Sequence, residues 1–139
     1  LIIAAHQQIT SSWWSERRSD FDCFISQFVL DEASVGHPAA VARRMEVLRH
    51  LKVLAATDNA EQLAREIIES KIIPPKAITD AAHIAVSAVH GMDYMLTWNC
   101  SHLANAQILK KLRLFCFGQG YLLPDICTPE ELMEDYQDG

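Results

Sequence analysis

Glycine and proline are scarce in this sequence, with five of each among 139 residues. So low a content excludes a collagen-like, linker-rich or disordered chain. Half of the residues are hydrophobic, which predicts one domain with a buried core. Basic residues are also few, since 12 Lys and Arg stand against 18 Asp and Glu and give a formal charge of −6. This balance excludes a broad basic surface that binds nucleic acid non-specifically.

Tight cysteine pairs and long apolar runs are both missing. The four cysteines, Cys23, Cys100, Cys116 and Cys127, are scattered and form no C-x-x-C motif, which predicts reduced thiols and a cytoplasmic protein. No apolar run approaches the ~20 residues of a membrane span, and no secretory signal is evident, so we expect no membrane association. Residues 1–6 lack an initiating Met and resemble the interior of a helix, so we expect a preceding segment.

Short apolar runs alternate with helical patterns along the chain. We expect strands at 21–26, 52–55, 94–98 and 125–127, and helices at 1–19, 28–33, 39–51, 60–70, 76–90, 104–114 and from 129 onward. Ser26 and Thr128 are predicted N-caps of helices, and the segment Thr57-Asp58-Asn59 offers a cap for the helix at 60–70. The small, apolar segment 76–90 predicts the most buried helix, ending at Gly91. This alternation is typical of an α/β fold with a mostly parallel sheet covered on both faces.

Polar side chains gather after two of the expected strands. Candidates for a site at that edge of the sheet are Ser26, Gln27, Asp31 and Glu32, then Thr97, Asn99, Ser101 and His102, with Asp80 early in the buried helix. Carboxylate, amide and hydroxyl oxygens are the ligands that hard cations such as Mg²⁺ and Mn²⁺ prefer. The simpler interpretation is that Asp80 stabilises a helix dipole and that Glu32 is a solvated helix residue.

Three segments together resemble the PIN-domain family, metal-dependent ribonucleases that include the VapC-like toxins. They are Ser26-Gln27-Phe28-Val29-Leu30-Asp31-Glu32, Asp80-Ala81-Ala82-His83-Ile84-Ala85-Val86-Ser87-Ala88 followed by Gly91, and Met95-Leu96-Thr97-Trp98-Asn99. Their order and spacing match over almost the whole chain. The resemblance implies one PIN-like domain over 1–139, a three-layer α/β/α fold in which the first, central strand of the parallel sheet is missing from this chain.

The resemblance also implies the site residues and the chemistry. Glu32 and Asp80 would be ligands of Mg²⁺ or Mn²⁺, and Asn99 would orient water or a phosphate oxygen. Thr97 and Asp31 would contact these groups without binding the metal. The implied reaction is hydrolysis of RNA phosphodiester bonds. Two positions depart from the family pattern, because the first family acid would precede this chain and Asn99 stands where an Asp is usual.

The resemblance implies partners as well. VapC-like toxins are commonly homodimers and are inhibited by a small antitoxin, so we expect an RNA substrate, an antitoxin and a second copy of the chain. The departures leave a second hypothesis open, a catalytically inactive PIN-like module that binds protein or RNA. A third class, a purely structural protein, requires that Glu32, Asp80 and Asn99 do not converge.

Other sites are weighed on the residues alone. His83 and His90, with Cys100 and His102, could form a zinc site, and Cys100 with a histidine could form a nucleophilic pair. Aromatic rings that could stack on bases are Trp13, Trp14 and Tyr94, although one of the adjacent Trp rings is expected in the core. Cations that could contact RNA are Arg17, Arg18, Arg43, Arg44, Lys110, Lys111 and Arg113.

Overall fold

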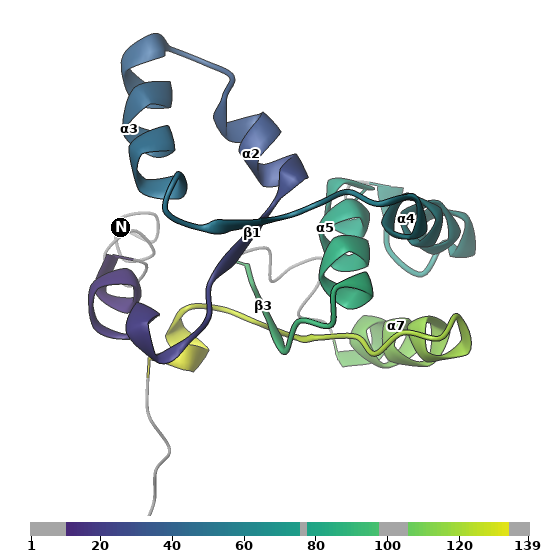
Figure 1. Cartoon of the computed structure of the whole chain (residues 1–139). Coiled ribbons are helices and arrows are strands. Elements are labelled where there is room, and N and C mark those ends of the chain that lie inside the picture. Colours follow the sequence, from purple (N-terminus) through teal and green to yellow (C-terminus); the bar gives the residue numbers. More distant parts are fainter. Residues whose placement is uncertain (1–10, 76–77, 98–105, 134–139) are drawn as a thin grey trace, which may run out of the picture.

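A computed structural model describes residues 11–75, 78–97 and 106–133. Residues 11–16 are helical and lead into a 3₁₀ turn, η1 (Arg18–Asp20). The elements that follow are β1 (Phe24–Ser26), α2 (Gln27–Ala33), α3 (Pro38–Leu48), β2 (Lys52–Leu54), α4 (Asp58–Ser70), α5 (Ile78–Val89), β3 (Tyr94–Leu96), α7 (Ala106–Gly118), β4 (Asp125–Cys127) and the 3₁₀ turn η3 (Glu130–Leu132). The fold is therefore α/β, as the sequence predicts (Figure 1).

The described strands form two separate parallel pairs. β1 pairs with β2, with Ile25 opposite Val53, and β3 pairs with β4, with Met95 opposite Ile126. Each pair is joined through helices, α2 and α3 for the first and α7 for the second, as parallel pairing requires. Parallel pairing is confirmed, whereas the expected continuous sheet is absent from the described residues. β1 and β3 each keep one edge that no described strand pairs with.

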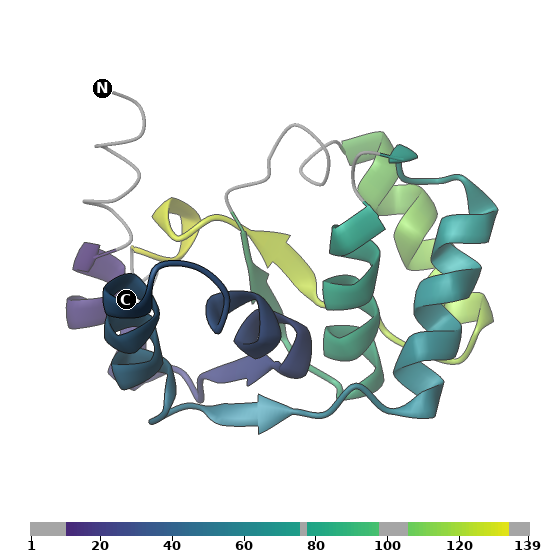
Figure 2. The same cartoon turned by 90° about the horizontal axis from the view of Figure 1, so that it is seen from above.

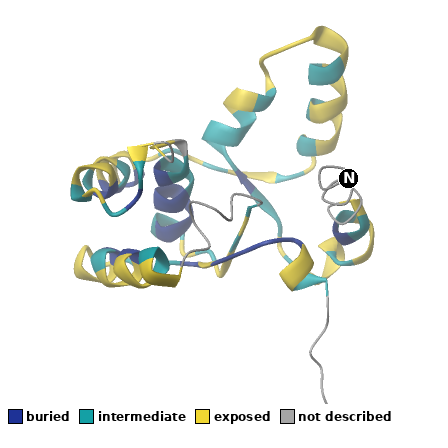
Figure 3. Ribbon diagram, turned by 180° about the vertical axis from the view of Figure 1, so that it is seen from behind, coloured by how far each residue is buried: buried dark blue, intermediate teal, exposed yellow. Residues whose placement is uncertain are grey.

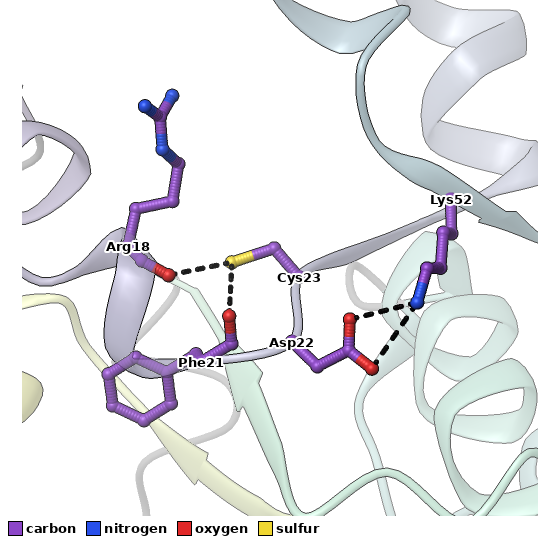
Figure 4. A network of polar contacts seen from close by, with 5 residues as sticks. All are labelled: Arg18, Phe21, Asp22, Cys23 and Lys52. Carbon is purple, nitrogen blue, oxygen red and sulfur yellow. Dashed lines mark hydrogen bonds and ion pairs between the residues drawn. The ribbon is translucent and has the colours of Figure 1, made fainter.

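Polar contacts fix the start of β1 against β2 (Figure 4). The Lys52 Nζ donates to Asp22 Oδ1 at 3.2 Å and lies 5.3 Å from the centre of the Phe24 ring. The thiol of Cys23 donates to the carbonyl oxygens of Arg18 at 3.8 Å and Phe21 at 4.0 Å. All of these groups lie at or near the surface, so they set the path of the chain more than they stabilise it.

The core lies where α4, α5, α7 and β4 meet (Figure 2). Its buried members are Leu63, Ile67, Ile73, Ala81, Ile84, Ala85, Ala88, Leu112, Cys116 and Ile126. The small side chains of α5 allow close packing, and α5 carries more buried residues than any other described helix, as predicted. Gly91 ends it with φ +71°, and the amide of Met92 donates to Ser87 O at 2.9 Å, which is the hydrogen bond of a Schellman cap.

Helices α2 and α3 form an arm on the opposite side of the molecule, and neither contains a buried residue (Figure 3). Pro38 occupies the first turn of α3, as expected, and His37 caps that helix through its ring nitrogen. Arg44 of α3 ties the arm together, donating to Ala33 O at 3.3 Å and to Val35 O at 2.9 Å. The arm is thus held by polar contacts and partial burial.

Several expected boundaries differ from the observed ones. The first strand is Phe24–Ser26, because 21–23 precede the ladder, and α7 continues one turn past Leu114 because Cys116 packs into the core. Thr128 exchanges hydrogen bonds with Glu131 as in a capping box, yet the described residues after it form only a 3₁₀ turn. Residues 1–10 of the helix expected at 1–19, and the expected strand end at Trp98, lie outside the described residues.

Candidate functional site

The first group of the site is the hydroxyl of Ser26, which lies at the carboxyl end of β1. Its Oγ accepts a hydrogen bond from the Val29 amide at 3.2 Å and so caps α2, as the sequence predicts. The same Oγ lies 3.4 Å from Nδ1 of His83 on α5. Residues 57 positions apart are thereby joined, and the start of α2 is fixed against α5.

Glu32 lies near the end of α2 and faces the same histidine. Its Oε1 is 3.7 Å from His83 Nε2, and its side chain is 58% exposed, whereas that of His83 is 18% exposed. The ring of Phe28 packs edge-on against the His83 ring, with centroids 6.4 Å apart. The imidazole is therefore enclosed between α2 and α5, and the carboxylate stands at the rim with access to solvent.

Asp80 is half-buried in the first turn of α5. It precedes His83 by three residues, and side chains at that spacing share one face of a helix. His83 contacts Glu32, so the end of α2 meets α5 one helical turn beyond Asp80. The sequence-predicted pair of acids thus belongs to one region of the fold.

Two of the remaining expected site residues, Asp31 and Thr97, lie in the described part of the chain, and Asn99 does not. Asp31 is exposed and its Oδ1 accepts from Gln27 Nε2 at 2.9 Å, along α2 itself. Thr97 follows β3, and its amide donates to Cys127 O at 2.9 Å, which extends the pairing with β4. Asn99, with Cys100 and His102 of the zinc and nucleophile alternatives, lies outside the described residues.

The donor set can be tested against a divalent cation. Across 11–75, 78–97 and 106–133, no three His, Cys, Asp or Glu side chains group closely enough to hold a metal. A closed protein cage is therefore not what these residues form. Carboxylates such as those of Glu32 and Asp80 are the type of ligand that hard cations of the Mg²⁺ type prefer, and one or two of them commonly bind such a cation while water and substrate phosphate complete its coordination.

Ser26, His83 and Glu32 include the residue types of a nucleophilic triad, but their arrangement differs from one. In a triad the imidazole takes the hydroxyl proton through Nε2 while the acid holds Nδ1. Here Nδ1 faces Ser26 and Nε2 faces Glu32, and the Ser26 oxygen is already the cap of α2. The serine is therefore a structural group, and Glu32 is the exposed end of the chain of contacts.

Most of the other candidate groups have structural contacts. His90 Nε2 lies 2.9 Å from Ala55 O, and His83 is engaged as described, so neither points to a zinc site. Trp13 is 6% exposed and packs against Phe21 with ring centroids 5.7 Å apart, which excludes base stacking by that ring in this conformation. The half-exposed Tyr94 ring meets Phe21 edge-on at 6.0 Å.

Some of the candidate cations have structural contacts, and others are exposed. Arg17 donates to Leu132 O at 3.1 Å and to Asp20 at 2.6 Å, and Arg44 is bonded within the arm. The Arg18 guanidinium lies 4.4 Å from the centre of the Trp14 ring. Exposed cations that remain available to a polyanion include Arg43, Lys110 and Lys111.

The cysteines are free thiols where the structure describes them, namely Cys23, Cys116 and Cys127. Burial raises the pKa of Cys116 to about 11, and burial together with the nearby carboxylates of Glu131 and Asp125 raises the pKa of Cys127 to about 11. Desolvation also raises the pKa of Cys23, against an opposing effect of Arg18. None of the three has the lowered pKa of a nucleophilic cysteine.

Sequence reasoning weighed His83 only as a zinc ligand or a core residue and missed its contact with Glu32. The signal was its spacing of three from Asp80, which puts it on the face of α5 that carries the acid.

Within the described residues no helix is long and apolar enough to cross a bilayer. Comparisons with protein-family models, with curated proteins and with solved structures yielded no significant match to this chain.

Proposed function

We propose that this chain is a metal-dependent endoribonuclease of the PIN-like type that hydrolyses RNA phosphodiester bonds, as the toxin of a toxin–antitoxin pair. The observation that carries the proposal is the contact between Glu32 and His83, which joins the acid of α2 to α5, the helix with Asp80 in its first turn. The parallel β1–β2 and β3–β4 pairs are compatible with a PIN-like sheet completed by a strand between β1 and β3.

In this proposal the chain's own groups have separate tasks. Glu32 and Asp80 would hold Mg²⁺ or Mn²⁺, and Asn99 would orient water or a phosphate oxygen. Thr97 would contact these groups without binding the cation. The bound cation would supply activation of water and neutralisation of the charge that develops on the phosphodiester. Glu32 is more than half exposed, so its carboxylate is accessible from solvent.

Charge also makes metal loading a condition for RNA binding. The chain has a formal charge of −6, and its acids at the α2–α5 border repel a polyanion unless a cation neutralises them. Arg43, Lys110 and Lys111 are exposed and can bind the RNA backbone once that repulsion is removed. An antitoxin and a second copy of the chain are the proposed protein partners, on the resemblance alone.

The test is cleavage of a mixed-sequence single-stranded RNA by the full-length protein, freed of any partner, in Mn²⁺ or Mg²⁺. Asp80→Ala is expected to slow cleavage by about 100-fold or more, since loss of several kcal/mol of charge stabilisation has that effect. Asp58→Ala is the matched control, because Asp58 is also a first-turn helix acid, in α4. If Asp80 only stabilised a helix dipole, the two variants would cleave alike.

The second candidate function is an inactive PIN-like module that binds protein or RNA. Among the described residues, no three His, Cys, Asp or Glu side chains form a group that could hold a metal, which favours this module. It predicts that the full-length protein binds RNA without cutting it in either metal. That result would overturn the nuclease proposal and retain the fold.

A further inference from the structure

One continuous set of contacts runs from the backbone of α2 through α5 and back to the acid of the site. The Val29 amide donates to Ser26 Oγ at 3.2 Å, Ser26 Oγ lies 3.4 Å from His83 Nδ1, and His83 Nε2 lies 3.7 Å from Glu32 Oε1. Both ends of the set are on α2 and its middle is on α5. The three side chains therefore act on one another across the border between the arm and the core.

The position of the ring hydrogen follows from the carboxylate. A carboxylate can only accept, and Glu32 faces Nε2, so it favours the tautomer in which Nε2 carries the ring hydrogen. Nδ1 then accepts from the Ser26 hydroxyl at 3.4 Å, and the Ser26 oxygen in turn accepts from the Val29 amide. The Nε2–Oε1 separation of 3.7 Å is longer than a hydrogen bond, so Nε2–H attracts Oε1 through the charge of the carboxylate.

Glu32 needs such a partner more than Asp80 does. It is carried by α2, a helix of seven residues with none buried, and its own side chain is 58% exposed. An unrestrained glutamate side chain loses rotamer freedom when it binds a ligand, and that loss of entropy lowers its affinity for the ligand. His83 is held on α5 by Ser26 and by the Phe28 ring, so it can restrict the carboxylate without moving itself.

We propose that His83 is the positioning residue of Glu32: Ser26 fixes the imidazole, and Nε2–H orients Oε1 so that the second carboxylate oxygen is directed to a divalent cation. This inference rests on the proposed function, because the cation is the one that Glu32 and Asp80 hold. Outer partners of this kind change metal affinity by about 10- to 100-fold when they are removed.

The first experiment examines the free protein. Long-range ¹H–¹⁵N correlation spectra of the ¹⁵N-labelled full-length protein report which ring nitrogen of His83 carries the hydrogen when the ring is neutral. The expected result is the Nε2–H form, changed by Ser26→Ala. The Nδ1–H form in the wild-type protein would overturn the inference whether or not the protein binds a metal.

The second experiment measures Mn²⁺ binding by electron paramagnetic resonance in two variants that separate the ring nitrogens. His83→Asn keeps a polar group near Nδ1 but cannot reach Glu32, whereas His83→Gln keeps an N–H donor near the position of Nε2. Asn is expected to weaken Mn²⁺ binding by about tenfold or more, and Gln to restore most of that loss. His90→Gln is the control, since His90 directly follows the same helix and bonds to the Ala55 backbone.

Glu32→Gln separates this inference from the proposed function. If Glu32→Gln abolishes Mn²⁺ binding while both His83 variants bind like the wild type, the positioning role is wrong and the metal site stands. If the wild-type protein itself binds no Mn²⁺, the proposed function fails, and the cation-directed role of His83 fails with it.

Discussion

The two sides of this molecule are built in different ways. Helices α4, α5 and α7 share a core in which Leu63, Ile67, Ile84 and Leu112 are 1% exposed or less. The arm of α2 and α3 has no buried residue and is held by the Arg44 hydrogen bonds and a few half-buried side chains. The proposed site lies between them, with Asp80 and His83 on the packed side and Glu32 on the arm.

This difference explains why the contact at His83 matters. A group on a well-packed helix is oriented by its scaffold, whereas a group on a weakly anchored segment needs a specific partner to hold it. Asp80 belongs to the first kind and Glu32 to the second. Local opening of the arm would separate the two acids without unfolding the core.

The largest predicted effect contrasts one core residue with one arm residue. Ile84→Ala removes a fully buried side chain from α5 and is expected to lower the free energy of unfolding by about 2–5 kcal/mol. Met45→Ala on α3, where the side chain is only half-buried, is expected to cost well under that. Urea unfolding of both variants measures the contrast, and equal losses would show that the arm is as tightly packed as the core.

Alkaline pH should act on the packed side. Between pH 9 and about 11 the thiols of Cys116 and Cys127 ionise in the unfolded chain but stay protonated in the fold, so unfolding releases protons and stability falls as pH rises. A raised pKa of this size corresponds to roughly 2–3 kcal/mol per thiol at full effect. Cys116→Ala should flatten the slope of unfolding free energy against pH over this range, and an unchanged slope would contradict the assignment.

Two glycines sharpen the comparison further, because a Cβ at either would meet no atom within 4 Å. Gly91 has φ +71°, whereas Gly118 is helical. Gly91→Ala is expected to destabilise the protein by about 1–2 kcal/mol, since an L-residue is strained in that conformation. Gly118→Ala should be neutral or stabilising by up to about 1 kcal/mol. Thermal unfolding distinguishes them, and a similar shift in both variants would contradict the cap at Gly91.

The smallest effect concerns the arm alone. Arg44→Gln removes the donors to Ala33 O and Val35 O, and is expected to change global stability by no more than about 0.5 kcal/mol. Amide hydrogen exchange in α2 and α3 should nevertheless become faster, while exchange in α5 stays the same. Arg43→Gln, at the neighbouring exposed position, is the control. Uniformly faster exchange in all helices would show that the arm and the core open together.

The features that the sequence predicted correctly are those set by local chemistry. The cap at Ser26 forms as expected, and within the predicted capping segment 57–59 the cap is Thr57, because a β-region hydroxyl residue satisfies a free helix amide. The burial of α5 follows from its small apolar side chains. The sequence pattern did not predict the division of the strands into two pairs, because that division depends on long-range packing that no local pattern encodes.

The site was predicted in part. Glu32 and Asp80 were chosen by spacing and resemblance, and their elements do meet. The contact between Glu32 and His83 could not be chosen in advance, because it depends on how the arm docks on α5. The role of Asn99 stays a prediction, since that residue lies outside the described part of the chain.

The most direct test compares two adjacent acids on α2 in the Mn²⁺-dependent cleavage of single-stranded RNA by the full-length protein. Glu32 faces His83 and Asp31 is bonded to Gln27, so the two variants differ in site geometry and hardly in charge or helix position. We predict that Glu32→Gln reduces the cleavage rate by about 100-fold or more, while Asp31→Asn stays close to the wild type. Wild-type cleavage by Glu32→Gln, or an equal loss in both variants, would contradict the proposed site.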